Sequence, residues 1–192
     1  MDAAFEIKEK ARRLNRRIVF PEAQDPRVRQ AAGMLAAEGL CTPVLVDGGR
    51  MGEAPAGVEV VRPSQDRRVE RFAEQLFEKR KAKGMTLEKA REHVLDPLFF
   101  GGFLVASGDC HGAVAGSEAT TASVLRAGIH VVGTAKGIAT VSSCFLMQVG
   151  DTPYTYADCG VVPDPTAEQL VDIALASAES HRRLAGEAPK VA

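Results

Sequence analysis

The stretch RIVFPEAQDPRV, residues 17–28, decides the fold. Its first four residues form a short apolar run that Pro21 stops, which is typical of a buried strand. Asp25-Pro26 then opens a helix, because an acidic N-cap followed by proline at the first helical position is a helix-start signal. A buried strand followed within a few residues by a helix indicates a β-α unit, from which parallel sheets are built.

The same alternation continues outward in both directions. Its strands read as continuous apolar runs rather than alternating ones, which predicts an α/β protein of three layers with a mainly parallel sheet. Asp158-Cys159 is expected to close a strand, and Ser64 is a helix-cap candidate. We expect helices over residues 3–14, 25–39, 64–84, 86–94, 120–132 and 164–184, and strands over residues 43–46, 58–61, 112–116 and 141–149.

The composition excludes several classes of protein. The 192 residues are 45% hydrophobic and 26% charged, which is ordinary for a globular protein. No apolar run approaches the roughly 20 residues that span a bilayer. The N-terminus has no signal-peptide core, and Asp2, Glu6 and Glu9 argue against a mitochondrial presequence, so we expect a cytoplasmic protein. The net charge of −1 gives no general attraction for nucleic acid, and an anionic ligand must be held by local arginines.

The four cysteines predict neither a metal site nor a redox centre. They form no C-x-x-C pair and no ligand spacing with the four histidines. An even count permits two disulfides, but apolar neighbours, as in Ser-Ser-Cys144-Phe-Leu, favour reduced and buried thiols. The cysteines are Cys41, Cys110, Cys144 and Cys159.

The common catalytic and nucleotide-binding motifs are missing from the sequence. There is no G-x-G-x-x-G after a strand, no G-x-x-x-x-G-K-[ST] and no G-x-S-x-G. Cys110-His111 suggests a nucleophile and a base, but adjacent residues rarely face each other and the pair would need a third, orienting group. These patterns therefore assign no catalytic residue.

Three arginines are more informative. Arg27 lies just inside a predicted helix, Arg80 stands in a basic cluster after one, and Arg126 follows Thr120-Thr121 in a glycine-flanked segment. For each, the alternative is a solvated surface arginine. A guanidinium group binds phosphate oxygens through two parallel hydrogen bonds, and doubly wound sheets bind ligands at the carboxyl ends of their strands.

Seven segments in fixed order resemble the phosphate acetyl/butyryl transferase family, on its acetyltransferase side. The resemblance covers essentially all 192 residues. The segments are Ile18-Val-Phe-Pro-Glu22, Asp25-Pro-Arg27, Glu78-Lys-Arg-Lys-Ala-Lys-Gly-Met-Thr86, Thr120-Thr-Ala-Ser-Val-Leu-Arg126, Val141-Ser-Ser-Cys-Phe-Leu-Met147, Ala157-Asp-Cys159 and Pro163-Asp-Pro-Thr-Ala-Glu-Gln-Leu-Val-Asp-Ile-Ala174.

The resemblance implies two α/β domains with a cleft between them, similar to the isocitrate dehydrogenase fold. We expect residues 1–136 to form the first domain and residues 137–192 the start of a second, incomplete one. It also implies an acyltransferase that moves an acetyl group between acetyl phosphate and coenzyme A. Coenzyme A is then a substrate, no metal or other cofactor is needed, and the assembly is expected to be a homodimer.

The resemblance also assigns candidate binding residues. Arg27, Arg80 and Arg126 match positions that bind the phosphates of coenzyme A or acetyl phosphate. Thr120 and Thr121 match a hydroxyl pair that lines the cleft, although threonines at a helix start serve equally well as caps.

The sequence departs from the family pattern at several positions. Ala119 and Ser123 stand where the family often carries histidine and aspartate, and residues 110–112 read Cys-His-Gly instead of Ala-Asp-Gly. The family's Asp-Leu-Ser-Arg-Gly segment does not occur in these 192 residues. Its serine, arginine and aspartate are expected to stabilise the transition state and deprotonate the thiol. We therefore assign no catalytic residue and expect the 192 residues alone not to transfer acetyl groups.

Two other functions fit the resemblance. One is a regulatory module that binds acetyl-coenzyme A without turnover. The altered residues Ala119 and Ser123 favour this reading modestly. The other is a phosphate butyryltransferase, which acyl-chain preference would reveal.

Overall fold

The computed structural model describes residues 3–192 and divides into two compact units. One unit comprises residues 11–133, and the other combines the N-terminal residues up to Lys10 with residues 134–192. This division lies a few residues before position 137, and the domain assignment from the sequence stays a prediction.

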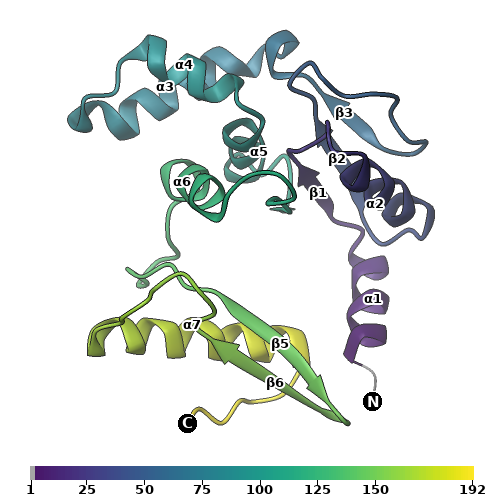
Figure 1. The fold of residues 1–192 in the computed structure, drawn as a ribbon, viewed down its shortest axis with the longest axis vertical. Coiled ribbons are helices and arrows are strands. Elements are labelled where there is room, and N and C mark those ends of the chain that lie inside the picture. Colours follow the sequence, from purple (N-terminus) through teal and green to yellow (C-terminus); the bar gives the residue numbers. More distant parts are fainter. Residues whose placement is uncertain (1–2) are drawn as a thin grey trace. The chain divides into compact units, whose positions relative to one another are not determined.

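The unit of residues 11–133 contains a four-stranded parallel sheet (Figure 1). Its strands lie in the order β3-β2-β1-β4, with Val19 beside Val44 and Ile18 beside Gly112. Because β1 is central and has a parallel neighbour on each side, the carboxyl ends of β2, β1 and β4 meet at one edge. The strands are β1 (Arg17–Phe20), β2 (Thr42–Val46), β3 (Glu59–Val61) and β4 (Gly112–Ala113).

Both faces of this sheet are covered, which confirms the three-layer α/β prediction. Successive side chains of a strand point to opposite faces. Accordingly, Val19 packs into one hydrophobic cluster and its neighbour Phe20 into another. The second cluster includes Ala32 of α2 (Pro26–Ala37), so α2 covers that face. Burial on both faces explains why these strands read as unbroken apolar runs.

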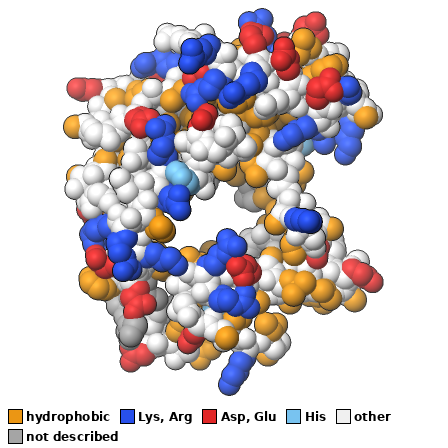
Figure 2. Space-filling model, turned by 180° about the vertical axis from the view of Figure 1, so that it is seen from behind, with side chains coloured by type: hydrophobic (Ala, Val, Ile, Leu, Met, Phe, Trp, Pro, Cys, Tyr) orange, Lys and Arg blue, Asp and Glu red, His pale blue; other side chains and the backbone are white. Residues whose placement is uncertain are grey.

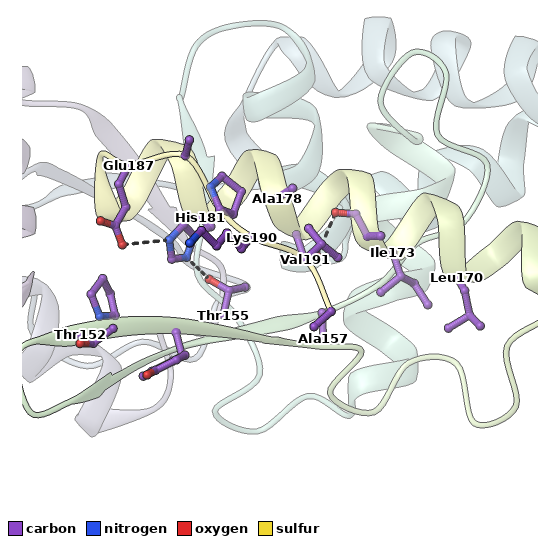
Figure 3. A pocket seen from close by; sticks show the side chains of 17 residues that line it. Thr152, Thr155, Ala157, Leu170, Ile173, Ala178, His181, Glu187, Lys190 and Val191 are labelled. Atoms are coloured by element: carbon purple, nitrogen blue, oxygen red, sulfur yellow. Dashed lines mark hydrogen bonds and ion pairs between the residues drawn. The ribbon is translucent and has the colours of Figure 1, made fainter.

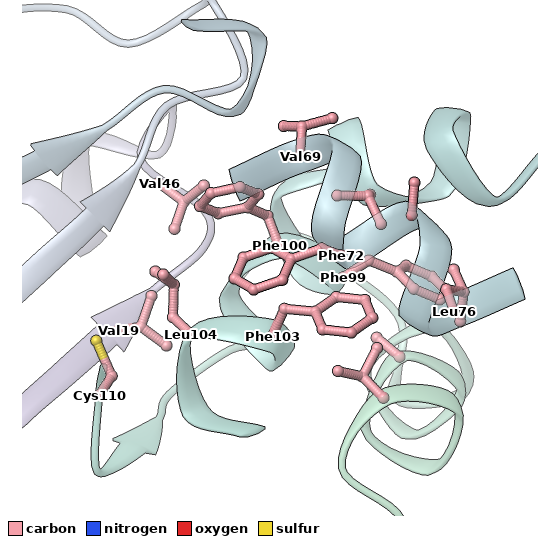
Figure 4. Packing of buried hydrophobic residues seen from close by; sticks show 14 of the residues in the cluster. Val19, Val46, Val69, Phe72, Leu76, Phe99, Phe100, Phe103, Leu104 and Cys110 are labelled. Atoms are coloured by element: carbon pink, nitrogen blue, oxygen red, sulfur yellow. The ribbon is translucent and has the colours of Figure 1, made fainter. Parts of the chain in front are cut away.

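The opposite face packs against a group of helices with an aromatic core (Figure 4). The ring of Phe72 stacks on Phe103 with centroids 4.8 Å apart and meets Phe100 edge-on at 5.5 Å. Aromatic pairs in these arrangements stabilise a core by about 0.5–1.5 kcal/mol beyond burial. The helices are α3 (Arg68–Arg80), α4 (Leu87–Leu95), α5 (Pro97–Ala106) and α6 (Thr121–Val131).

Helix α5 was not predicted from the sequence, yet it lies at the centre of this core. It reads PLFFGGFLVA and buries residues on several sides, so it shows no amphipathic period. The start signal was present, because Asp96-Pro97 repeats the pattern of Asp25-Pro26, and the Asp96 carboxylate accepts a hydrogen bond from the backbone nitrogen of Leu98. Gly101 allows close contact with the sheet, since an added Cβ would lie 3.5 Å from the Val19 side chain.

The second unit contains an antiparallel hairpin and one long helix. Strand β5 (Cys144–Val149) pairs with β6 (Thr152–Ala157), and α7 (Ala167–Ala185) packs against the hairpin. Helix α1 (Ala3–Leu14) agrees with the prediction. The expected strand over 141–149 begins only at Cys144, and the hairpin after it was not foreseen. As expected, a strand ends just before Asp158.

Several element boundaries differ from prediction because local capping decides them. Helix α7 starts at Ala167, because Thr166 and Gln169 form a reciprocal capping box that replaces the expected Asp164-Pro165 start. Ser64 does not cap α3, since it lies inside a separate 3₁₀ turn, η1 (Pro63–Gln65). A second 3₁₀ turn, η2 (Lys81–Lys83), follows α3, and β4 is shorter than the expected strand over 112–116.

The cysteines are free thiols, as expected, but only Cys110 is buried. Cys144 is exposed on β5, so the prediction of buried thiols is wrong there. Among residues 3–192, no helix combines the length and apolar character needed to cross a membrane.

Candidate functional site

The carboxylate of Glu22 organises the loop that follows β4. Glu22 lies two residues after β1, and its side chain is buried. One carboxylate oxygen accepts hydrogen bonds from the backbone nitrogens of Gly116 and Ser117, at 2.6 and 2.9 Å. The other accepts from Glu118 and Ala119, both at 2.7 Å. Four consecutive N–H groups thus surround one carboxylate, which fixes the path of the chain into α6.

This arrangement also sets the charge of Glu22. Burial alone would raise the pKa of a carboxyl group, but the four backbone donors outweigh it and hold the pKa of Glu22 below its ordinary value. The carboxylate is therefore ionised at neutral pH and keeps its four partners.

A second bridge links the same loop to the start of α2. Asp25 caps α2 by accepting from the backbone nitrogen of Arg27 at 2.8 Å, and it accepts a short hydrogen bond from the Ser117 hydroxyl. The guanidinium group of Arg27 pairs with the Asp25 carboxylate, with Nη2 2.7 Å from Oδ2, and donates to the Ser117 carbonyl at 3.2 Å. The Arg27 side chain lowers the pKa of Asp25 most, and the Ser117 hydroxyl lowers it further.

The predicted residue Arg27 is therefore exposed and already ion-paired. Its side chain is 73% exposed, whereas that of Asp25 is 2% exposed. The pair raises the pKa of Arg27, first through its hydrogen bond with Asp25. Arg27 reaches solvent beside the loop of residues 116–119, which places a permanent cation next to the start of α6.

Thr120 and Thr121 stand at the N-terminus of α6, and both are exposed. Thr120 is the N-cap, and its side chain accepts a hydrogen bond from the backbone nitrogen of Ser123 at 3.2 Å. The capping alternative considered for this pair is thus correct for Thr120. Thr121 is the first residue of the helix and lies at the end where the helix dipole favours anions.

A small cavity lies at the carboxyl edge of the sheet, beside this loop. It encloses about 300 Å³ and is lined by Glu22 and Ala119, by Gly48 after β2, and by Pro97 at the start of α5. Open parallel sheets bind their ligands in this position. Arg50 is its cationic lining residue.

The two other predicted arginines lie on helices α3 and α6 of the same unit. Arg80 ends α3, and Arg126 lies in α6. The neighbour of Arg80, Lys79, donates from Nζ to the carbonyl of Val131 at 2.5 Å, which holds the end of α3 against the C-terminal end of α6. Burial lowers the pKa of His130 most, and the charges of Arg80 and Arg126 lower it further.

We call His130 and the groups whose charge lowers its pKa the His130 cluster. It comprises Arg80, Lys83, His93, Arg126 and His130, drawn from α3, η2, α4 and α6. Along α6 the rise of about 1.5 Å per residue places Arg126 roughly 9 Å from Thr120. The chain thus presents two cationic positions, Arg27 with the N-terminus of α6 and the His130 cluster, on adjoining elements.

Several residues of this arrangement were not predicted from the sequence. Lys83, His93 and His130 were not singled out, although His130 lies four positions after Arg126 and shares its helix face. Glu22 was quoted only as part of a motif. An acidic residue directly after a buried strand carries no signal that it will bind the backbone of a loop far along the chain.

Cys110 and His111 do not form a catalytic pair. Burial raises the pKa of the Cys110 thiol, and the thiol faces the core beside Val19 (Figure 4). His111 is exposed, and its Nδ1 accepts from the backbone nitrogen of Arg17 at 3.2 Å, at the amino end of β1. That edge is opposite to the one at which parallel sheets bind ligands.

Asp158, in the other unit, anchors a loop. Its carboxylate accepts from the backbone nitrogens of Val162 at 2.7 Å and Val161 at 2.8 Å, and from the backbone nitrogen and hydroxyl of Ser143 at 2.6 and 2.8 Å. The donor at Val162 lowers its pKa most, against the effect of burial. A carboxylate surrounded by donors is a poor proton acceptor.

A groove of about 610 Å³ runs between β6, α7 and the chain from Glu187 onward (Figure 3). His181 is buried in it, with Nδ1 2.9 Å from the Thr155 hydroxyl and Nε2 3.6 Å from the Glu187 carboxylate. None of the predicted binding residues lines this groove.

Among residues 3–192, no group of three or more histidine, cysteine, aspartate or glutamate side chains is placed to hold a metal ion. Blue and red side chains are interspersed over the face in Figure 2, so local geometry rather than one-sided charge directs an anion. Glu22 and Asp25 both have lowered pKa values, and neither suits the deprotonation of a thiol.

The chain is similar to known proteins of one family. Curated phosphate acetyltransferases from Treponema pallidum and Acetivibrio thermocellus are 39% and 38% identical over 92% and 97% of this chain. Two solved structures superpose well. A phosphotransacetylase from Streptococcus pyogenes gives a TM-score of 0.86 at 32% identity, and the EutD phosphotransacetylase from Staphylococcus aureus gives 0.83 at 28% identity. The superpositions include 95% and 96% of this chain, respectively.

The chain spans only part of these relatives. It covers 57% and 60% of the two curated proteins and 58% of each solved chain. A family model described as phosphate acetyl/butaryl transferase matches residues 4–192. The chain belongs to the phosphate acetyl/butaryl transferase family.

Proposed function

We propose that the chain binds coenzyme A through its phosphates. It contributes this binding site to an acyltransferase, which moves an acetyl group between acetyl phosphate and coenzyme A. The observation that carries the proposal is that Arg80 and Arg126 lie on α3 and α6, two helices that pack against each other, although 46 positions separate the two arginines in the sequence. Arginines on two packed helices suit a phosphate group better than scattered surface charges do. The curated relatives, named phosphate acetyltransferases, support acetyl rather than butyryl transfer.

In this proposal the binding residues have distinct tasks. Arg80 and Arg126 bind a phosphate of coenzyme A within the His130 cluster. Arg27 and the N-terminus of α6, with Thr120 and Thr121, bind a second anionic group, for which acetyl phosphate or inorganic phosphate is the candidate. Thr121 supplies the exposed hydroxyl, while Thr120 holds the helix end in place.

The reaction itself needs one proton transfer and one displacement. The thiol of coenzyme A loses its proton to a base, the thiolate attacks the acetyl carbonyl, and phosphate leaves with the electrons of the C–O bond. Donors that stabilise the oxyanion lower this barrier, and no metal takes part. Glu22 and Asp25 hold the loop beside the site and are not assigned as the base.

Titration calorimetry with the purified 192-residue chain tests this function. Coenzyme A should bind with measurable heat, and dephospho-coenzyme A, which lacks the 3′-phosphate, should bind more weakly. Binding of acetyl phosphate that depends on Arg27 would support the second anionic position. A chain that binds neither coenzyme A nor acetyl phosphate, while folded by circular dichroism, would contradict the proposal.

We also propose that the chain self-associates and acts in the cytoplasm. One face of the β5–β6 hairpin exposes Phe145, Met147, Val149, Tyr154 and Tyr156, and apolar patches of this kind mark interaction surfaces. The four free thiols fit a reducing compartment. Light scattering during gel filtration should give the mass of a dimer. A monomer at a protein concentration of about 50 μM would contradict self-association, because this concentration lies well above the dissociation constant expected of an obligate dimer.

A further inference from the structure

Arg27 can offer a ligand only part of its guanidinium group. A guanidinium carries five N–H donors, one on Nε and two on each terminal nitrogen. Nε lies 3.1 Å from both carboxylate oxygens of Asp25, while Nη2 lies 2.7 Å from Oδ2 of Asp25 and 3.2 Å from the Ser117 carbonyl. Among residues 3–192, the hydrogen bonds of Arg27 leave Nη1 without an acceptor. Two donors on this one nitrogen therefore remain for a ligand.

The two partners of Arg27 are themselves fixed in place. The buried Asp25 carboxylate also accepts from the backbone nitrogen of Arg27 at 2.8 Å and from the Ser117 hydroxyl. Ser117 is held in turn, because its backbone nitrogen donates to the Glu22 carboxylate at 2.9 Å. A side chain held from two sides has lost most of its rotamer freedom before a ligand arrives. The exposed guanidinium of Arg27 is thus an oriented group.

A second Asp-x-Arg arrangement in the chain shows what sets Arg27 apart. At the start of α3, Asp66 accepts from the backbone nitrogen of Arg68 at 2.9 Å and from its Nη2 at 2.7 Å, as Asp25 does with Arg27. There Nη1 is engaged as well, because it donates to the Asp109 carboxylate at 2.8 Å. All three nitrogens of Arg68 therefore have carboxylate partners, whereas Arg27 keeps Nη1 for solvent or a ligand.

We propose that Asp25 and Ser117 are positioning residues for the anion site assigned to Arg27, and that they hold its guanidinium so that only Nη1 faces a phosphate or acyl phosphate oxygen. The inference rests on the proposed function, because it needs Arg27 to bind that anion. A paired contact from two nitrogens is blocked, since Nη2 already donates to Asp25 and Ser117. The affinity then depends on how well these two residues keep Nη1 in place.

The sign of one substitution separates positioning from simple charge. Asp25→Asn keeps the N-cap of α2, because asparagine caps a helix about as well as aspartate does. It removes a negative charge beside the site, which by itself would strengthen the binding of an anion. It also releases Arg27, so the ligand must order this side chain itself, which weakens binding roughly 2- to 10-fold. A fall in affinity can therefore come only from lost positioning.

The experiment measures the dissociation constants of inorganic phosphate and of acetyl phosphate for the 192-residue chain, by NMR titration of its backbone amides. Asp25→Asn should bind each anion roughly 2- to 10-fold more weakly than the wild type. In the Arg27→Ala background the same substitution should no longer weaken binding, because no guanidinium group is left to position. Ser117→Ala, which leaves the helix cap untouched, should also weaken binding only when Arg27 is present. Asp66→Asn is the matched control and should bind both anions as the wild type does.

The possible failures have different meanings. If Arg27→Ala binds both anions as well as the wild type does, the anion site of the proposed function fails and the inference fails with it. If Arg27→Ala weakens binding but Asp25→Asn binds equally well or more tightly, the inference is overturned and the proposed function stands. An equal loss with and without Arg27 also overturns it. Circular dichroism checks the folding of each variant, and Ser117→Ala alone decides if Asp25→Asn does not fold.

Discussion

An Oε1 atom of Glu22 lies 2.7 Å from the backbone nitrogen of Ala119, a residue 97 positions further along the chain. This contact joins the end of the first strand to the start of α6. Since Thr120 and Thr121 follow directly, the position of the proposed anion site depends on a carboxylate that does not itself bind the ligand. The same loop is held from its other side by Asp25 and Arg27 through Ser117.

Glu22→Gln should destabilise the unit of residues 11–133. The amide keeps one oxygen acceptor but turns an NH₂ group toward two backbone donors, which leaves buried N–H groups without partners. We expect a loss of about 2–4 kcal/mol in the free energy of unfolding by urea. Glu118→Gln is the matched control, because this side chain is exposed and accepts a hydrogen bond from the amide of Gln24, and the effect of the change should stay within about 0.5 kcal/mol. Equal stability of the two variants would remove Glu22 as the anchor.

The same contact predicts an acid-sensitive stability. The pKa of Glu22 is lower in the folded than in the unfolded chain, so its contribution is present above the unfolded pKa near 4.5. It is lost as the pH falls through the lower, folded value. Stability should therefore fall below about pH 5, and Glu22→Gln should flatten this part of the profile. Urea midpoints between pH 3 and pH 7 measure it. A wild-type profile and a variant profile of the same slope would contradict the assignment.

Arg80→Lys separates a geometric role from a simple charge. Lysine keeps the positive charge but not the paired donors of the guanidinium group. We expect affinity for coenzyme A to fall by about tenfold while the urea midpoint stays unchanged, because one charge-assisted hydrogen bond stabilises binding by about 1.5 kcal/mol. Arg13→Lys, on the exposed surface of α1, serves as the control. Full affinity in Arg80→Lys would show a solvated arginine instead.

Residues 1–192 should bind coenzyme A without forming acetyl-coenzyme A from acetyl phosphate. The buried carboxylates beside the site, Glu22 and Asp25, are held by donors and have lowered pKa values, so neither accepts the thiol proton near neutral pH. Losing the base and the oxyanion donors together typically removes several orders of magnitude of rate. A spectroscopic assay of thioester formation, with an intact relative as positive control, measures this. Turnover near that of the relative would mean that a base has been overlooked among these residues.

How much the sequence reveals depends on how local each signal is. Strand β1 and the start of α2 were predicted correctly, because proline, N-cap and apolar run act within a few residues. Helix α5 was missed because it is apolar on all sides, and only its Asp96-Pro97 start is a local signal. Ser64 was misassigned because a 3₁₀ turn competes with an N-cap for the same residue types.

In the candidate site, too, contacts between residues far apart in the sequence could not be predicted. Arg80 and Arg126 were singled out from their sequence context and then matched through the resemblance, whereas His130 was not singled out. The link between Glu22 and residues 116–119 joins positions more than 90 residues apart, and it uses backbone N–H groups, which every residue except proline carries. The sequence therefore does not predict such a contact, and only the folded structure shows it.

The affinity of Arg126→Ala for coenzyme A and for dephospho-coenzyme A tests the central claim most directly. A hydrogen bond to a charged group contributes about 1.5–3 kcal/mol, so the variant should bind coenzyme A about 10- to 150-fold more weakly than the wild type. If Arg126 contacts the 3′-phosphate, its removal should hardly change the affinity for dephospho-coenzyme A, because the partner is already absent. Arg13→Ala should bind both ligands as the wild type does. Unchanged affinity for coenzyme A in Arg126→Ala would contradict the account.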